Sequence, residues 1–135
     1  MKEYTSKQLA KRKLKEFHQW CRVSVLHQDR IQVDKYWMVT LFEFDPEDYK
    51  DRMYDWQREA PSEVNEILKA INEIPKPRHR ATLVMSYILP EKIQIKEQAQ
   101  RLRIAESTYY LDKALALMEF AKRYRNGILD QDKSW

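Results

Sequence analysis

The chain of 135 residues holds a single glycine, and this scarcity limits the folds that are open to it. Phosphate-binding loops and dinucleotide-binding turns need several glycines, because the backbone there approaches its ligand closely and takes positive φ angles. The tight turns of hairpin-rich sheets also depend on Gly and Asn. We therefore expect an all-α fold, without P-loop or Rossmann chemistry.

Apolar residues recur at helical spacing from the N-terminus onward. Thr5 and Gln8 have the pattern of a capping box, which predicts that a first helix begins there. The stripe that follows at intervals of three and four is Ala10, Leu14, Phe17, Cys21 and Val25. The first turns also hold a basic cluster, either a solvated face or a nucleic-acid contact: Lys11, Arg12, Lys13 and Lys15.

Residues 35–44 allow two interpretations. Their β-branched and aromatic residues favour a strand, but no partner strand is evident, and a short buried helix is the alternative. Asp45-Pro46 then has the pattern of a helix start, and Tyr49, Met53 and Trp56 would mark the apolar face of that helix.

The sequence Ala60-Pro61-Ser62 predicts a boundary, with Pro61 or Ser62 opening a new helix that Pro75 and Pro77 end. We expect a helical N-terminal region over 1–60, a domain of four helices over 61–127, including one at 78–89, and a C-terminal tail over 128–135. Asn126-Gly127 is a suitable stop for the last helix.

The segment 95–113 has the pattern of a helix-turn-helix, the motif by which many regulators bind DNA. Ala99 would let two helices cross closely, and Leu102 and Ile104 would be buried beside the turn. Arg103 occupies the turn position that glycine often holds. Three further positions that usually hold aliphatic residues are polar here: Gln98, Tyr109 and Asp112.

The C-terminal half resembles the ArpU family of phage transcriptional regulators. The resemblance covers about 62–129 and rests on Glu106-Ser107-Thr108-Tyr109-Tyr110, Ala116-Leu117, Phe120-Ala121 and Tyr124-Arg125 before Gly127, with 66–72 and Ile74-Pro75 upstream. It implies a domain similar to region four of bacterial sigma factors. It also implies a role in controlling phage or prophage late genes for packaging and lysis.

We therefore expect a sequence-specific regulator that binds double-stranded DNA, with the helix from Glu106 in the major groove. The candidates for reading bases are Glu106, Ser107, Thr108, Tyr110 and Lys113. The candidates for phosphate contacts are Arg78, His79, Arg80, Lys96 and Arg101. The charge distribution is compatible with this role, because residues 1–30 carry a net +5 and residues 78–135 a net +4, around an acidic middle.

Partners besides DNA stay open. The aromatic-rich segment 17–56 could form a homodimer interface or dock against host RNA polymerase. Two other functions stay open as well. One is a DNA-recognition module for phage packaging or assembly, which would form a ring, and the other is an adaptor that binds polymerase without contacting DNA.

Other classes of protein are disfavoured. The only cysteine, Cys21, excludes an intramolecular disulfide and a multi-cysteine metal site, and fits a reducing compartment. The N-terminus lacks the apolar core of a signal peptide, and no apolar run approaches the length of about 18 residues that a membrane span needs. No nucleophile or metalloprotease motif is present. We expect a protein of the bacterial cytoplasm, associated with the nucleoid, that is not an enzyme and needs no cofactor or metal.

Overall fold

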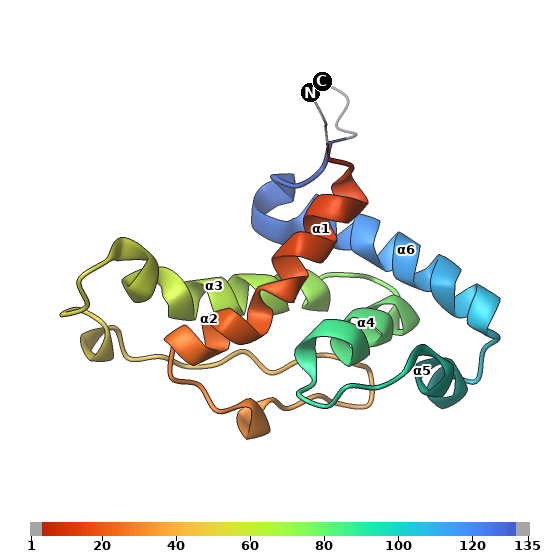
Figure 1. Cartoon of the computed structure of the whole chain (residues 1–135), viewed down its shortest axis with the longest axis horizontal. Helices are drawn as coiled ribbons and strands as arrows, with labels where there is room; N and C mark the ends of the chain where they lie inside the picture. The colour runs from red at the N-terminus through yellow and green to blue at the C-terminus, as the bar shows by residue number, and fades with distance from the viewer. Residues whose placement is uncertain (1–3, 132–135) are drawn as a thin grey trace.

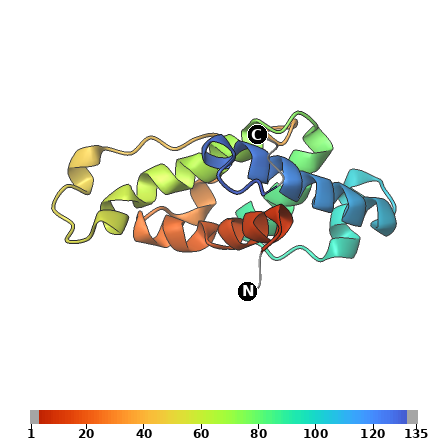
Figure 2. The ribbon, with the colours of Figure 1, turned by 90° about the horizontal axis from the view of Figure 1, so that it is seen from above.

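A computed structural model describes residues 4–131, and over this range the protein is all-α, with one isolated pair of bridged residues in place of a sheet. Two long helices organise it, with α1 and α4 packed against α6 and α2 packed against α3 (Figures 1 and 2). The α-helices are α1 (Ser6–Lys15), α2 (Phe17–Val23), α3 (Asp55–Asn72), α4 (Pro77–Leu83), α5 (Ile95–Leu102) and α6 (Glu106–Arg123). Shorter helical turns are η1 (Gln28–Arg30), η2 (Pro46–Asp48), η3 (Val84–Ile88) and η4 (Tyr124–Gly127).

The predicted start of the first helix is confirmed. The Thr5 hydroxyl accepts a hydrogen bond from the Gln8 amide at 3.1 Å, and the Thr5 amide donates to the Gln8 side chain at 2.9 Å. The helix is divided at Glu16 into α1 and α2. Val25 was wrongly placed in its apolar stripe: α2 ends at Val23, and Val25 has φ 56° and a side chain that is 71% exposed.

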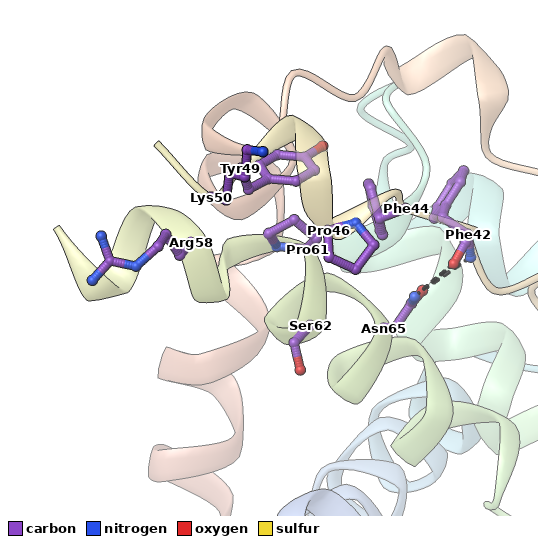
Figure 3. A pocket seen from close by; sticks show the side chains of 9 residues that line it. All are labelled: Phe42, Phe44, Pro46, Tyr49, Lys50, Arg58, Pro61, Ser62 and Asn65. Atoms are coloured by element: carbon purple, nitrogen blue, oxygen red, sulfur yellow. Dashed lines mark hydrogen bonds between the residues drawn. The ribbon is translucent and has the colours of Figure 1, made fainter. Parts of the chain in front are cut away.

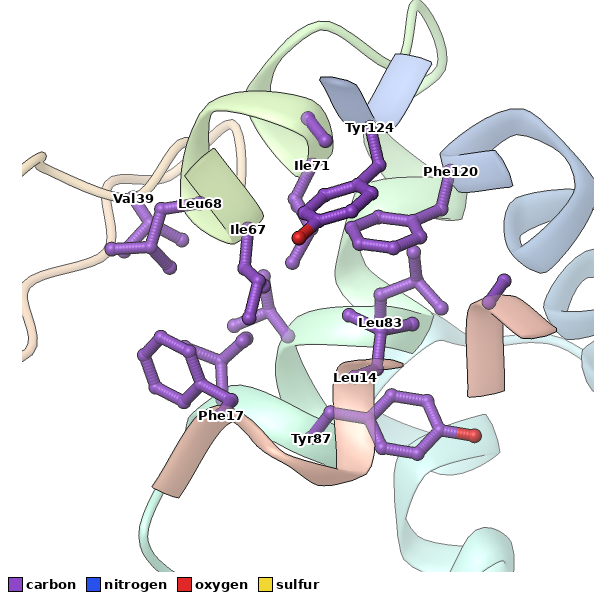
Figure 4. Close-up of a cluster of buried hydrophobic side chains, with 14 of the residues drawn as sticks. Leu14, Phe17, Val39, Ile67, Leu68, Ile71, Leu83, Tyr87, Phe120 and Tyr124 are labelled. Carbon is purple, nitrogen blue, oxygen red and sulfur yellow. The ribbon is translucent and has the colours of Figure 1, made fainter. Parts of the chain in front are cut away.

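One core joins the N-terminal helices to the rest of the chain (Figure 4). Its largest part lies where α1, α2, α3, α4 and α6 meet, so segments far apart in the sequence bury one another's apolar side chains. Among its members are Leu14, Phe17, Val39, Ile67, Leu68, Ile71, Leu83, Phe120 and Tyr124. The predicted boundary between residues 60 and 61 falls inside α3.

Pro61 does not start a helix. It lies within α3, buried, although proline has no amide to donate to the preceding turn. The predicted helix at Asp45-Pro46 is also wrong, because only the single turn η2 forms there, capped by Asp45, which accepts from the Glu47 amide at 3.0 Å. Met53 lies outside any helix and is 78% exposed.

Residues 31–44 form no helix. The chain turns at residues 35–36 and pairs with itself only at the bridge between Val33 and Val39, and α3 supplies further hydrogen-bond partners for its backbone. Asn72 accepts from the Val39 amide and donates to the Val39 carbonyl, both at 2.8 Å. One heptad earlier on α3, Asn65 bonds the Phe42 amide at 2.9 Å and its carbonyl at 2.7 Å. These two side-chain amides satisfy backbone groups that a lone strand would leave unpaired.

The predicted helix over 78–89 is confirmed and consists of α4 and η3. Its last turn is widened, because the Leu89 amide donates to the Val84 carbonyl five residues back at 3.0 Å. The last helix stops where expected: Arg125, Asn126 and Gly127 all have positive φ angles. Of the predicted tail 128–135, residues 132–135 lie outside the described residues. No helix within residues 4–131 has both the length and the apolar character of a membrane span.

Candidate nucleic-acid interface

Two helices, α5 and α6, are joined by a turn of three residues, 103–105. Arg103 has φ 57° and ψ 43°, the left-handed conformation that favours glycine, and its amide closes α5 by donating to the Gln100 carbonyl at 3.0 Å. The Ile104 amide donates to the Ala99 carbonyl at 3.1 Å. Ala99 is buried, while Leu102 and Ile104 are partly buried. The turn therefore has the conformation that the motif predicts, with an arginine in the position of the glycine.

A polar cluster fills the space between these helices and η3, where aliphatic residues are usual. Gln98 and Tyr109 are 3% and 0% exposed, and the Tyr109 hydroxyl donates to the Gln98 side-chain oxygen. Ser86 lies 3.0 Å from the same hydroxyl and 3.2 Å from the Gln98 oxygen. The Gln98 amide nitrogen donates to the Ile93 carbonyl at 2.8 Å. Because each of these groups has a partner, the polar residues are compatible with burial and fix how α5 meets α6.

Asp112, the third polar residue, anchors α6 to α4. Its carboxylate, buried in α6, lies 2.5 Å from the Arg78 Nε and 3.6 Å from His79 Nε2. Arg78 is half exposed, so its guanidinium reaches the carboxylate from the surface. The charge on Asp112 is therefore compensated. Arg78 binds α6 through this ion pair, so its main role is structural and contact with phosphate is secondary.

The first turns of α6 are the most exposed part of the motif. They lie with α5 at one end of the molecule, as both views show (Figures 1 and 2). Glu106 and Ser107 are exposed, Thr108 is partly exposed, and Tyr110 is 56% exposed. Four of the five residues predicted to read bases therefore lie where a duplex could reach them.

Lys113, the fifth of these residues, lies in a different environment. It is partly buried, with its ammonium group 5.2 Å from the centre of the Tyr87 ring, in a groove between α6 and α1. Burial lowers the pKa of Lys113, and the charges of Lys11 and Lys15 on α1 lower it further. The sequence motif could not reveal this groove, because α1 lies about 100 residues away in the chain.

The other four predicted phosphate contacts divide into two groups. Lys96 and Arg101 are exposed on α5, and Arg101 is paired with Glu97 at 3.0 Å. His79 and Arg80 are each only 7% exposed, so neither lies where it could contact phosphate as predicted.

Arg80 is occupied by backbone carbonyl groups. It donates to Ile74 at 2.6 Å and to Tyr36 at 2.8 Å, and so joins the end of α3 to the segment 31–44. Burial lowers the pKa of His79, which favours its neutral form. In a run of basic residues, the sequence alone does not distinguish an inward-facing cation from an exposed one.

The sequence motif did not predict an exposed apolar face on α6. Leu111 and Leu115 are 61% and 42% exposed, and they follow Ser107 at intervals of four. The spacing of these leucines in the sequence predicts their exposure, because it places them on the face of the helix away from buried Tyr109 and Ala116. This face adjoins the exposed start of α6.

A separate cavity of about 550 Å³ lies at the other end of the molecule, between α3 and residues 42–50 (Figure 3). Its walls are largely aromatic and proline side chains: Phe42, Phe44, Pro46, Tyr49 and Pro61. The polar groups at its edge have partners within the chain. The Tyr49 hydroxyl donates to the Ser24 carbonyl at 2.7 Å, Lys50 is paired with Glu47 at 2.6 Å, and Arg58 is paired with Asp55. The cavity therefore offers an apolar surface and no free charge.

Comparison with protein-family models, with curated proteins and with solved structures found no match to this chain. In the described part of the chain, His, Cys, Asp and Glu side chains form no group of three or more that could hold a metal ion.

Proposed function

We propose that the protein binds double-stranded DNA and regulates transcription, with the start of α6 in the major groove. The observation that carries this proposal is the exposure of Ser107 and Tyr110 on a helix that begins directly after the α5–α6 turn. An α-helix fits the major groove, where each base pair presents a distinct set of donors and acceptors. The hydroxyl groups of Ser107, Thr108 and Tyr110 can form hydrogen bonds with these donors and acceptors. Glu106 can accept a hydrogen bond from a cytosine amino group.

The neighbouring cations fit the second task of such a surface, which is to hold the DNA backbone. Lys96 and Arg101 lie exposed on α5, one helix before the proposed recognition helix. Contacts of this kind set the position of the protein on the duplex without reading its sequence. Two sets of buried contacts also support the proposal, because they hold α6 in one orientation. They are the polar cluster around Tyr109 and the Asp112–Arg78 pair.

The biological setting rests on the resemblance to the ArpU family. From it we propose control of phage or prophage late genes by a domain similar to sigma region four, in the bacterial cytoplasm. A homodimer and a contact with host RNA polymerase are both compatible with this role. The aromatic-lined cavity between α3 and residues 42–50 is the surface within 17–56 that best suits such a protein contact.

A second candidate function, the polymerase-binding adaptor, is favoured by one observation. Leu111 and Leu115 are exposed beside the proposed base-reading residues, and exposed apolar faces often mark protein contacts. An adaptor would bind a protein through the same end of α6 and would not contact DNA.

Selection of bound duplexes from a random pool tests the proposal. The wild-type protein should enrich a discrete sequence. The variant Ser107→Ala/Tyr110→Ala should lose that preference, and the matched variant Thr40→Ala/Tyr36→Ala, on exposed residues of the segment 31–44, should keep it. If the wild type enriches no sequence, the adaptor is favoured. If the variant Ser107→Ala/Tyr110→Ala keeps the sequence preference, another surface of the protein reads the bases.

A further inference from the structure

The basic cluster of α1 separates into two faces. Lys13 turns inward, 3.1 Å from Glu16 and 3.5 Å from Glu63, and Arg12 lies over the Tyr4 ring. Lys7, Lys11 and Lys15 instead follow one another at intervals of four and are exposed. One turn of helix separates each from the next, so the three ammonium groups form a row along α1.

This row borders the groove that holds Lys113. Lys7, Gln8 and Lys11 of α1 form one wall, and Tyr110, Lys113, Ala114 and Leu117 of α6 form the other, around a volume of about 390 Å³. The floor is apolar and includes Tyr87. Burial is the main cause of the lowered pKa of Lys113, and repulsion from the charges of Lys11 and Lys15 adds to it.

None of these four lysines has an acidic partner among residues 4–131. Three other cations on or beside α1 and α6 do have one: Lys13 has Glu16 and Glu63, Arg78 has Asp112, and Arg123 has Glu119. Four unpaired ammonium groups beside a low-polarity floor repel one another, and an anion in the groove would relieve that repulsion.

We propose that the groove between α1 and α6 binds the phosphate backbone of duplex DNA, through Lys7, Lys11, Lys15 and Lys113. This inference rests on the proposed function and extends it to the N-terminal helix. Tyr110 links the two surfaces, because it lines the groove and also belongs to the exposed start of α6. A duplex entered by α6 would thus bring one strand of its backbone alongside α1.

The proposal gives α1 a defined task. Its lysines carry no information about sequence, because phosphates are the same at every step. They would contribute affinity that falls with salt, since each neutralised phosphate releases counterions. Lys113 would then be a phosphate contact, held in place by Tyr87, instead of a base-reading residue.

The test measures duplex binding by fluorescence anisotropy from about 0.05 to 0.3 M salt. The variant Lys7→Gln/Lys11→Gln is compared with Lys35→Gln/Lys69→Gln, which removes the same charge from exposed lysines outside the groove. Loss of two phosphate contacts should lower the slope of log affinity against log salt by about 1.8. Affinity at 0.1 M salt should fall by about tenfold or more, for preferred and random duplexes alike. The control pair should keep the slope of the wild type.

The outcomes separate this inference from the proposed function. If the wild type binds duplexes and the groove variant keeps the full slope, the groove is not a phosphate site, while the role of α6 stands. If the wild type binds no duplex at any salt concentration, both proposals fail. Both lysine pairs lie on the surface, so unchanged unfolding midpoints for the two variants verify that the fold is intact.

Discussion

The two ends of this molecule are built by different means. At the α5–α6 end, regular helices meet through buried side chains, and the surface around them is basic. At the opposite end, residues 42–54 have little helix and are held to α3 by Asn65, within a segment, 31–60, that carries a net −4. Under the proposed function, a polyanion would be attracted to the first end and repelled by the second, and a protein partner would use the aromatic-lined cavity of the second.

The largest effect is expected from Asn65→Ala/Asn72→Ala. It leaves the backbone groups of Val39 and Phe42 without partners, and an unpaired buried group costs about 1–3 kcal/mol, so we expect a loss of roughly 4 kcal/mol in the free energy of unfolding. Urea denaturation measures this loss, and Gln19→Ala, an exposed amide, is the control. Limited proteolysis should cut the variant first within 31–44. Cleavage that begins in α5 or α6 would show that the two ends do not differ in this way.

A smaller effect is expected from Glu63→Gln, at the junction of α3 with the C-terminal turn. Burial alone would raise the pKa of Glu63, but hydrogen bonds from Tyr124 and Arg125 and the charge of Lys13 lower it overall. A carboxyl group whose pKa is lowered on folding stabilises the protein above its unfolded pKa of about 4.3, and this contribution is lost as the pH falls. We expect a loss of about 2 kcal/mol at pH 7.

The pH dependence provides the control for Glu63→Gln. Below about pH 4 the variant and the wild type should approach each other in stability, because the wild-type carboxyl group is then becoming protonated. Denaturation measured from pH 3 to pH 7 checks this. A difference that stays constant over that range would mean that the charge of Glu63 contributes nothing to folding.

Two adjacent tyrosines then distinguish the inside of α6 from its surface. Tyr109→Phe removes a hydroxyl group that bonds Gln98 and Ser86, and should cost about 1–2 kcal/mol while base preference is retained. Tyr110→Phe removes an exposed hydroxyl group, so stability should change by less than about 0.5 kcal/mol while base preference is altered. Urea denaturation and duplex selection measure the two quantities, and the reverse assignment would refute the orientation of α6.

These contrasts also show what the sequence could and could not predict. Local rules were sufficient for the capping box at Thr5 and for the turn at Arg103, because the residues that decide them are neighbours in the chain. They failed at Pro61, where a helix continues through a residue that normally interrupts one. They also failed at Arg80, whose partners Tyr36 and Ile74 are brought to it only by the fold.

The candidate site follows the same division. The exposure of Ser107 and Tyr110 follows from their spacing along α6, and the sequence predicted their place in the motif. The surroundings of Lys113 depend on α1, and neither periodicity nor motif spacing connects these two helices. The hydrogen bonds from Asn72 to residue 39 and from Asn65 to residue 42 could not be predicted either, because nothing in the sequence around a helical asparagine indicates which distant residue it will contact.

The smallest effect is expected from Leu115→Gln on the exposed face of α6. Leu115 is 42% exposed, so its replacement by a polar residue should change the stability by less than about 0.5 kcal/mol and leave the mass in solution unchanged. Sedimentation at several concentrations checks the mass. A dimer that dissociates in this variant would place a subunit interface at the α6 end, and would contradict the assignment of protein contacts to the opposite end.

The central claim is that the start of α6 enters a DNA duplex. Backbone amide resonances, recorded by NMR before and after adding the selected duplex, test it most directly. We expect the largest shifts at Glu106, Ser107 and Tyr110, smaller shifts along Lys7 and Lys11, and none at the cavity residues Phe44 and Tyr49. Shifts concentrated at Phe44 and Tyr49, with Glu106 through Tyr110 unmoved, would contradict the account.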